Sequence, residues 1–441
     1  MPRTRLLSLR VRPLHRLALC VTALALGTVS LHAADFPVTD FGATADDTTL
    51  DTEAIQKAID TAHEKGGGRV VLPKGTVRSG SIFLKQNVEL HLPADAVLLG
   101  SNNIAGYPKR PTRIEGHFPE WRLALINAQN LTGVRITGSG KIDGNGILFW
   151  AAFWQRRKEN RNLTNLEIER PRLFLIDTCT DVRIEGLTLR DSGFWNVHLY
   201  RCRDVVLEGL DIASPGQGSV IRAPSTDGID IDSCQNVTIR RCKISVDDDC
   251  IALKGTKGPL ALQDESSPPV ENILIEDCEF GSGHGVLTCG SEATIVRNVT
   301  VRNCTIRGEN NIVRLKMRPD TPQLYENLLF ENLTLDSTGG RLFDVKPWTQ
   351  FFDLKGYPLQ PSVAKNITVR NVTGRYGSLG ILNPNSIDTV DGITLENVTL
   401  TVTDSKFELG EIVKNLTAKN VTINSQPFAS PTPAPSRKGG W

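Results

Sequence analysis

The chain has 441 residues, with 50 basic and 49 acidic side chains, and 39% of its residues are hydrophobic. That hydrophobic share is enough for a sizeable core and excludes a wholly disordered chain. The near balance of charge argues against a nucleic-acid binder that relies on bulk positive charge. Thirty-eight glycines and many Val, Ile, Thr and Asn residues favour β structure with frequent turns.

The two ends of the chain differ from its body. Residues 1–33 hold five arginines and no acidic residue, an apolar stretch too short to span a bilayer comfortably, and small residues suited to cleavage near Ala33. They predict a secretory signal peptide, and hence a secreted or periplasmic protein without a membrane partner. Residues 426–441 are rich in Pro and Ser and predict an unstructured tail. The expected domain is therefore 34–425.

The body of the chain repeats a short pattern. Rows such as "CRDVVLEGLDI" from Cys202 and "VRNVTVRNCTI" from Val296 recur at intervals of 23 to 39 residues. Each row alternates apolar and polar residues, as β-strands do, and most carry Asn or Asp at one fixed position, where left-handed turn geometry is tolerated. Units with one apolar face must stack to share a core. We predict an all-β fold, a right-handed parallel β-helix, rather than a leucine-rich horseshoe, whose leucine spacing and helical half are missing.

Most cysteines after residue 33 occupy two fixed positions of these rows. The first position holds Cys179, Cys202 and Cys234, and the second holds Cys242, Cys278 and Cys304. Other rows carry mostly aliphatic residues there, and buried free thiols behave as small apolar side chains. We therefore expect core thiols rather than disulfides. Without a Cys-x-x-Cys pair, a zinc site is not expected.

The start of the domain predicts a helical cap. Apolar residues from Ala54 to Ala62 follow helical spacing, Asp51 or Thr52 can cap the helix, and glycines at 66–68 end it. A short capping helix suits a solenoid, because an open end exposes core residues and strand edges.

A further strand precedes each row. When these strands are aligned with one another, reactive residues occupy the same position just before several of them. Asp227, Asp249 and His284 each stand just before such a strand, and Asp248 adds a further carboxyl. Equal positions of successive coils lie side by side in a β-helix. Each residue alone is ordinarily a turn or loop residue, but carboxylates about 5 Å apart repel and shift each other's pKa. Their shared register indicates acid–base catalysis or a cation site.

The next strand carries Arg314 and Lys316 at alternate, outward-facing positions, with Lys254 and His198 in neighbouring rows. Glycoside hydrolysis needs a protonated carboxyl for the leaving oxygen and an ionised carboxyl that activates water or attacks carbon. Cations beside such carboxyls suit an anionic sugar, and arginine is the better bidentate partner of its carboxylate.

Four motifs carry a resemblance to a known family. They are "STD" ending at Asp227, "DD" at Asp248–Asp249, "GHG" around His284 and "RLK" at Arg314–Lys316. In this order they resemble the N-T-D, D-D, G-H-G and R-I-K motifs of glycoside hydrolase family 28, the polygalacturonase family. The resemblance includes "FGATADDTTLDTEAIQKAID" near the start and "GSGKIDGNG" at 138–146, so it spans nearly all of the chain after the signal peptide.

The resemblance implies a parallel β-helix that hydrolyses galacturonosyl linkages in pectic polysaccharide of the cell wall, with inversion. It implies that Asp248 is the general acid, that Asp227 and Asp249 position and activate water, and that His284 supports the acid. Inversion fits a water held between carboxyls about 6.5–9.5 Å apart. We expect no cofactor, no metal ion, no nucleic-acid partner and a monomer.

The same resemblance implies that Arg314 and Lys316 bind a galacturonate carboxylate. Ser225 departs from the family motif, which has Asn at that position. The aromatic segment 346–358 is either a hydrophobic lid or a surface for sugar stacking, and the insertion around 150–158 could shape the cleft. The sequence leaves open whether cleavage occurs inside the substrate chain or at its end.

The sequence is also compatible with other functions. Within the same family, the substrate could be rhamnogalacturonan or another galacturonoside. A pectate-lyase-like β-helix would use the acids to bind calcium and an arginine to abstract a proton. A non-catalytic polysaccharide-binding β-helix would bind without turnover, which the stacked Asp and His residues argue against.

Overall fold

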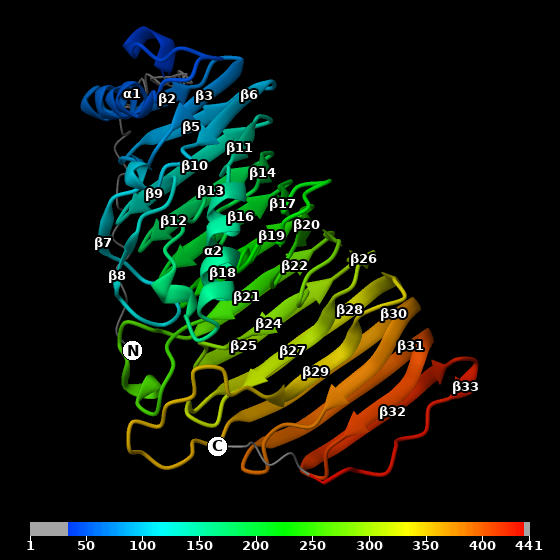
Figure 1. Cartoon of the computed structure of the whole chain (residues 1–441). Helices are drawn as coiled ribbons and strands as arrows, with labels where there is room; N and C mark the ends of the chain where they lie inside the picture. The colour runs from blue at the N-terminus through cyan, green and yellow to red at the C-terminus, as the bar shows by residue number, and fades with distance from the viewer. Residues whose placement is uncertain (1–33, 436–441) are drawn as a thin grey trace, which may run out of the picture. The chain divides into compact units, whose positions relative to one another are not determined.

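The computed structural model describes residues 34–435 of the chain. The expected signal peptide and the last six residues of the expected tail lie outside this range. From residue 34 onward the chain winds into coils of short parallel strands (Figure 1). The predicted fold class, a right-handed parallel β-helix, is confirmed.

Three parallel ladders form the faces of the β-helix, and a coil adds one strand to each in turn. The first ladder contains β1 (Asp35–Pro37), β2 (Gly68–Val71), β5 (Val88–Leu92), β10 (Thr132–Gly138), β13 (Thr180–Glu185), β16 (Arg203–Glu208), β19 (Gln235–Arg240), β22 (Val270–Glu276), β25 (Ile295–Arg302), β28 (Leu324–Asp336), β30 (Val363–Leu382), β31 (Thr389–Leu409) and β32 (Val413–Ile423). The second contains β3 (Gly75–Ser79), β6 (Ala96–Gly100), β11 (Lys141–Asp143), β14 (Thr188–Arg190), β17 (Asp211–Ser214), β20 (Lys243–Val246), β23 (Glu279–Phe280) and β26 (Thr305–Ile306).

The third ladder carries Lys254, Arg314 and Lys316. It contains β4 (Ile82–Phe83), β9 (Ile126–Gln129), β12 (Phe174–Asp177), β15 (Val197–Tyr200), β18 (Ile229–Asp232), β21 (Ile251–Lys254), β24 (Leu287–Cys289), β27 (Asn311–Met317) and β29 (Arg341–Pro347). The long strands β28, β30 and β31 bend from one ladder into the next. An antiparallel hairpin, β7 (Lys109–Pro111) with β8 (Glu120–Arg122), lies outside the coils.

The residue at the fixed turn position of each row has a left-handed backbone, as its residue types predict. Across the coils, φ at this position lies between 52° (Asn415) and 71° (Gly392). Side-chain amides stack along this column, and Asn298 donates to Asn272 (3.3 Å) while accepting from Asn327 (3.1 Å). Inside the coils, all eight described cysteines are buried and unpaired, as predicted for the six that occupy the two fixed row positions.

The N-terminal end of the core is covered by α1 (Thr52–Glu64), as predicted. Its buried residues, Ile55, Ala58, Ile59 and Ala62, belong to the hydrophobic core of the coils. Asp51 is the N-cap residue, but its carboxylate accepts from the backbone amide of Thr44 (3.0 Å) instead of capping the helix.

The C-terminal segment differs from the unstructured tail that its composition predicts, at least as far as residue 435. Strand β33 (Gln426–Pro427) pairs with β32, and the amide of Ala434 donates to the carbonyl of Leu409 (2.7 Å). Phe428 packs against the core, because the last coil leaves apolar surface that this segment partly covers.

One helix was not predicted. Helix α2 (Ile147–Glu159) lies in the insertion before β12, and its Trp150 is fully buried and donates to the carbonyl of Ser192 (3.0 Å). Short 3₁₀ turns occupy Val38–Phe41, Ile104–Gly106, Asn165–Glu167 and Ala261–Gln263. Within residues 34–435, neither α-helix has the length and apolar character needed to cross a bilayer.

Candidate active site

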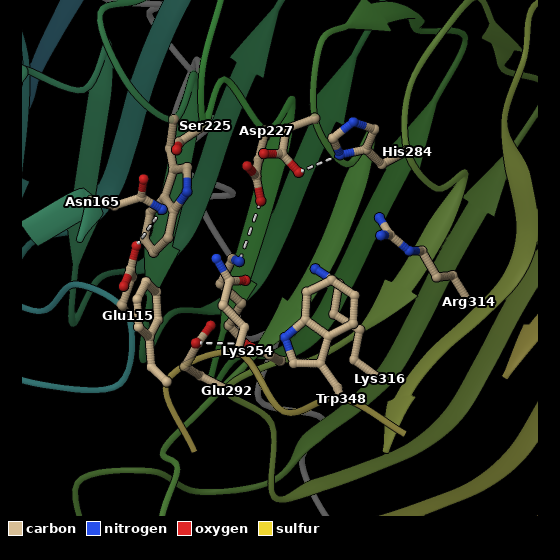
Figure 2. A pocket seen from close by; sticks show the side chains of 15 residues that line it. Glu115, Asn165, Ser225, Asp227, Lys254, His284, Glu292, Arg314, Lys316 and Trp348 are labelled. Carbon is tan, nitrogen blue, oxygen red and sulfur yellow. Dashed lines mark hydrogen bonds and ion pairs between the residues drawn. The ribbon is translucent and has the colours of Figure 1, made fainter. Parts of the chain in front are cut away.

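The candidate residues gather where the third ladder begins. Asp227, Asp248, Asp249 and His284 lie on the turns that lead from the second ladder into β18, β21 and β24. Lys254 at the end of β21, and Arg314 and Lys316 on β27, point outward from the same face. All of them except Asp249 line one cavity of about 250 Å³ (Figure 2).

The register of the coils corrects one detail of the sequence alignment. The alignment placed His284 level with Asp249, but Ala252 pairs with Thr288, which puts Gly285 level with Asp249. His284 is therefore level with Asp248, and its amide donates to the Asp248 carbonyl (2.8 Å).

Asp248 and His284 form a hydrogen-bonded pair at the edge of the cavity. Nδ1 of His284 lies 3.0 Å from Oδ1 of Asp248. This hydrogen bond raises the pKa of His284. Burial would raise the pKa of Asp248, but the hydrogen bond from His284 holds it below its usual value. These two shifts favour a protonated imidazole beside an ionised carboxylate.

Asp249 is fully buried beneath the cavity. Its Oδ1 accepts from the hydroxyl of Thr288 (2.7 Å) and from Arg314, and its Oδ2 accepts from Lys316 (2.8 Å). Burial opposes its charge, but these two cations hold its pKa far below the usual value. The resemblance to family 28 implies that Asp249, together with Asp227, positions and activates water. Oδ2 accepts only from Lys316 and keeps a free acceptor site, so the carboxylate is the counterion of Arg314 and Lys316 and its water-activating role stays a prediction.

Asp227 differs electrostatically from the other carboxyls. Burial raises its pKa to about 6, although Lys254 lies 3.2 Å from its Oδ2 and opposes the shift. The same ammonium lies 3.4 Å from Asp230, a fully buried carboxyl whose pKa burial raises well above its usual value. Lys254 also lies 4.6 Å from the ring of Trp195, so its charge is shared between aromatic and acidic neighbours.

Arg314 and Lys316 occupy one wall of the cavity together with Trp348 from the aromatic segment. The Arg314 guanidinium carbon lies 5.5 Å, and the Lys316 ammonium 4.8 Å, from the centre of the Trp348 ring. Both cations keep donors that Asp249 does not use. This wall can therefore receive an anion beside an aromatic face.

Several cavity residues were missed by the sequence analysis. Glu115, Asn165 and Glu292 line the cavity from three separate loops, and no motif marks them. Ser225 lines it too, with φ of 55°, a left-handed conformation that the Asn of the family motif adopts more readily than Ser.

A metal ion could find ligands here only at Asp248, Asp249 and His284, whose ligand atoms lie within 4.8 Å of one another among the described residues. Arg314 and Lys316 already bind both oxygens of Asp249. Because a divalent cation would have to displace these two positive charges, the electrostatics disfavour a metal at this position.

The site belongs to a carbohydrate-cleaving enzyme. It combines stacked carboxyls, a histidine and a wall that can receive an anion on a parallel β-helix. The sequence model of the glycosyl hydrolases family 28 matches residues 113–422, well over half of the chain. The chain belongs to this family and is a glycoside hydrolase. A second model, rhamnogalacturonase A/epimerase, pectate lyase-like, matches residues 36–95.

Individual relatives agree with this assignment. A probable polygalacturonase of Vitis vinifera is 36% identical over 241 residues, which cover 53% of this chain and about half, 46%, of that protein. An endo-polygalacturonase of Pectobacterium carotovorum is 27% identical over 85% of this chain and 88% of its own. The crystal structure of an exopolygalacturonase from Thermotoga maritima shares the fold, with a TM-score of 0.72 at 24% identity, over 90% of this chain and 93% of that one.

Proposed function

We propose that this family 28 hydrolase cleaves galacturonosyl linkages in pectic polysaccharide and inverts the anomeric carbon. The observation that carries the proposal is that one cavity holds the Asp248–His284 pair, Asp227, and the cationic pair Arg314 and Lys316. The first three supply acid and base, and the cations suit a substrate that carries a carboxylate on its sugar ring. Relatives named polygalacturonase support the same substrate class.

In this mechanism Asp248 protonates the glycosidic oxygen. Its proton comes from the pair with His284, and the arrival of substrate favours the neutral carboxyl because water is displaced from the site. Asp227 is the base, since it is ionised above pH of about 6 and lines the same cavity. It accepts a proton from the water that attacks the anomeric carbon, while Lys254 stabilises its charged form.

Substrate orientation comes from the wall formed by Arg314, Lys316 and Trp348. Arg314 and Lys316, held in place by Asp249, offer their remaining donors to the galacturonate carboxylate, and Trp348 offers an apolar face to the ring. A rhamnogalacturonan substrate would present its galacturonate to the same cations. Export by the segment 1–33 and action as a monomer on extracellular pectic material complete the proposal.

The experiment is incubation of the purified protein with polygalacturonate and with rhamnogalacturonan, with products resolved by size. Saturated galacturonate products from polygalacturonate, formed equally with and without a calcium chelator, are expected. Unsaturated products that absorb in the ultraviolet and require calcium would contradict hydrolysis. Products from rhamnogalacturonan alone would keep the reaction and change the substrate.

A further inference from the structure

A second cavity adjoins the active-site cavity, and we call it the distal cavity. Its volume is about 250 Å³, and Glu115 and Phe351 line both spaces. Glu115 lies in the loop between β7 and β8 and accepts a hydrogen bond from the amide of Asn165 (3.2 Å; Figure 2). The two cavities therefore meet at Glu115 and Phe351, where a bound sugar chain can extend from one into the other.

Buried contacts hold the segment that carries Phe351 in place. Arg318, which is 1% exposed, donates to both oxygens of Asp320 (2.7 Å each). It also donates to the carbonyls of Gln350 (2.9 Å) and Phe351 (3.2 Å). The amide of Asp353 donates to Oδ2 of Asp320 (2.9 Å). The segment after β29 is therefore fixed to the end of β27, and the distal cavity has a defined wall.

Two lysines bring positive charge to the distal cavity. Lys257 lies in the loop between β21 and β22, and Lys355 lies in the loop between β29 and β30. The Lys257 ammonium lies 3.3 Å from Glu292 and keeps donors that this carboxylate does not use. Burial lowers the pKa of His117, and Lys257 and Lys355 lower it further. Both cations therefore act on the same space.

The acidic side chains that line the distal cavity have partners within the protein. Asp320 binds Arg318, and Oδ1 of Asp353 accepts from the amide of Lys355 (2.9 Å). Burial raises the pKa of Glu115, which favours its neutral form. Within residues 34–435, by contrast, no carboxylate lies within 4.0 Å of the Lys355 ammonium. This ammonium is therefore available to an anionic ligand.

Exposed aromatic rings stand beside these cations. Phe351 is 42% exposed, and its ring centre lies 6.0 Å from the Lys257 ammonium. Tyr357 is 43% exposed and lines a further cavity of about 390 Å³, which Lys257 and Lys355 also line. Ligand sites commonly combine aromatic surface with a few placed polar groups. A uronic acid, which has apolar ring faces and a carboxylate, fits this combination.

We propose that Lys257 and Lys355 form a second carboxylate-binding subsite, which holds a galacturonate of the substrate chain beyond the one at Arg314. This inference deepens the proposed function and rests on it. The two ammonium groups donate charge-assisted hydrogen bonds to that carboxylate, and Phe351 offers an apolar face to the ring. Neither lysine belongs to the four sequence motifs, because both lie in insertions between coils.

Substrate length separates this subsite from the catalytic centre. The shortest oligogalacturonate that the enzyme cleaves fills the active-site cavity, whereas hexagalacturonate also reaches the distal cavity. Lys355→Ala should lower kcat/KM on hexagalacturonate about two- to fivefold, the range of an exposed ion pair, and leave the shortest oligomer unchanged. Lys355→Glu repels the carboxylate and should lower kcat/KM on hexagalacturonate further. Lys414→Ala, on exposed β32 outside both cavities, is the matched control and should behave as wild type.

The possible failures are distinguishable. Equal losses on both oligomers would mean that Lys355 only attracts an anionic substrate from a distance. Unchanged rates of both Lys355 variants on hexagalacturonate would remove this residue from binding. Either result would overturn the subsite and leave the hydrolase proposal intact. Absence of hydrolysis of any galacturonide by wild-type protein would overturn the proposed function and the subsite with it.

A second measurement does not depend on turnover. In Asp248→Asn protein, bound hexagalacturonate should protect Lys355 from acetylation by acetic anhydride, read by mass spectrometry, and should leave the acetylation of Lys414 unchanged. The shortest oligomer should protect neither lysine. Equal acetylation of Lys355 with and without hexagalacturonate would overturn the subsite.

Discussion

Asp248 and His284 are joined by a hydrogen bond, and the proposed mechanism needs a proton on the Asp248 carboxyl at the moment of bond cleavage. Asp248→Asn keeps the shape of the side chain but cannot donate an acidic proton. We expect kcat to fall by about 10²–10⁴ with substrate binding retained. Asp277→Asn, at an exposed turn outside the cavity, makes the same chemical change and should leave kcat unaltered. Near-normal turnover by Asp248→Asn would remove Asp248 from the role of acid.

Asp227 and the Asp248–His284 pair also determine the pH dependence of kcat/KM, which reports the pKa values of the free enzyme. Activity should fall as the pH drops through about 6, because Asp227 becomes protonated and can no longer act as base. It should fall again as the pH rises through the raised pKa of His284, because the pair loses its proton. In His284→Gln the alkaline limb should move to lower pH. An alkaline limb that stays in place would mean that His284 does not supply the proton.

A variant of Lys316 tests whether this residue binds the carboxylate of the substrate. Lys316→Ala should weaken binding of galacturonate oligomers by about 1–3 kcal/mol, the range of a hydrogen bond to a charged group, and should affect methyl-esterified oligomers much less. Lys346→Ala is the matched control, because Lys346 stands level with Lys316 on the next coil and pairs with Asp344 (2.8 Å) outside the cavity. Equal losses on free and esterified substrate would mean that Lys316 acts only through Asp249.

Among the structural elements, every coil contains one turn at the fixed row position, where a left-handed residue, mostly Asn, stacks on its equivalents in the neighbouring coils. Asn298→Ala loses both stacked amide bonds and forces alanine into φ near 58°, so the free energy of unfolding should fall by about 1–2 kcal/mol. Asn298→Gly accepts the same backbone, as Gly392 does in its own coil, and should cost less. Chemical denaturation of the two variants makes the comparison. A glycine variant less stable than the alanine variant would contradict the role of backbone conformation.

The sequence predicts those elements that short stretches of residues determine by themselves. Alternation of apolar residues and a left-handed Asn position determine the first ladder, and helical spacing determines α1. The sequence did not determine the strand register at His284. Val286 and Leu287 are both apolar and both buried, so alternation does not distinguish an alignment of His284 with Asp249 from one with Asp248. Helix α2 was missed because apolar and polar residues do not separate clearly onto two sides of it.

At the scale of the whole molecule, the catalytic motifs could be read from the sequence because they recur in register along the coils. Glu115, Asn165 and Glu292 could not, because they come from loops far apart in the chain and meet only through buried contacts such as Arg113–Asp232. The coils of the β-helix thus carry the catalytic motifs, and the insertions between the coils line the rest of the cavity.

In the proposed mechanism the acid Asp248 and the base Asp227 act on opposite sides of one galacturonosyl bond in a single displacement. Proton NMR of the first products from oligogalacturonate, recorded before the anomers equilibrate, distinguishes a single displacement from a double one. We expect the newly formed reducing end to appear first with the anomeric configuration opposite to that of the bond cleaved. First products with the original configuration would contradict it, since they require a covalent glycosyl intermediate and a carboxyl acting as nucleophile.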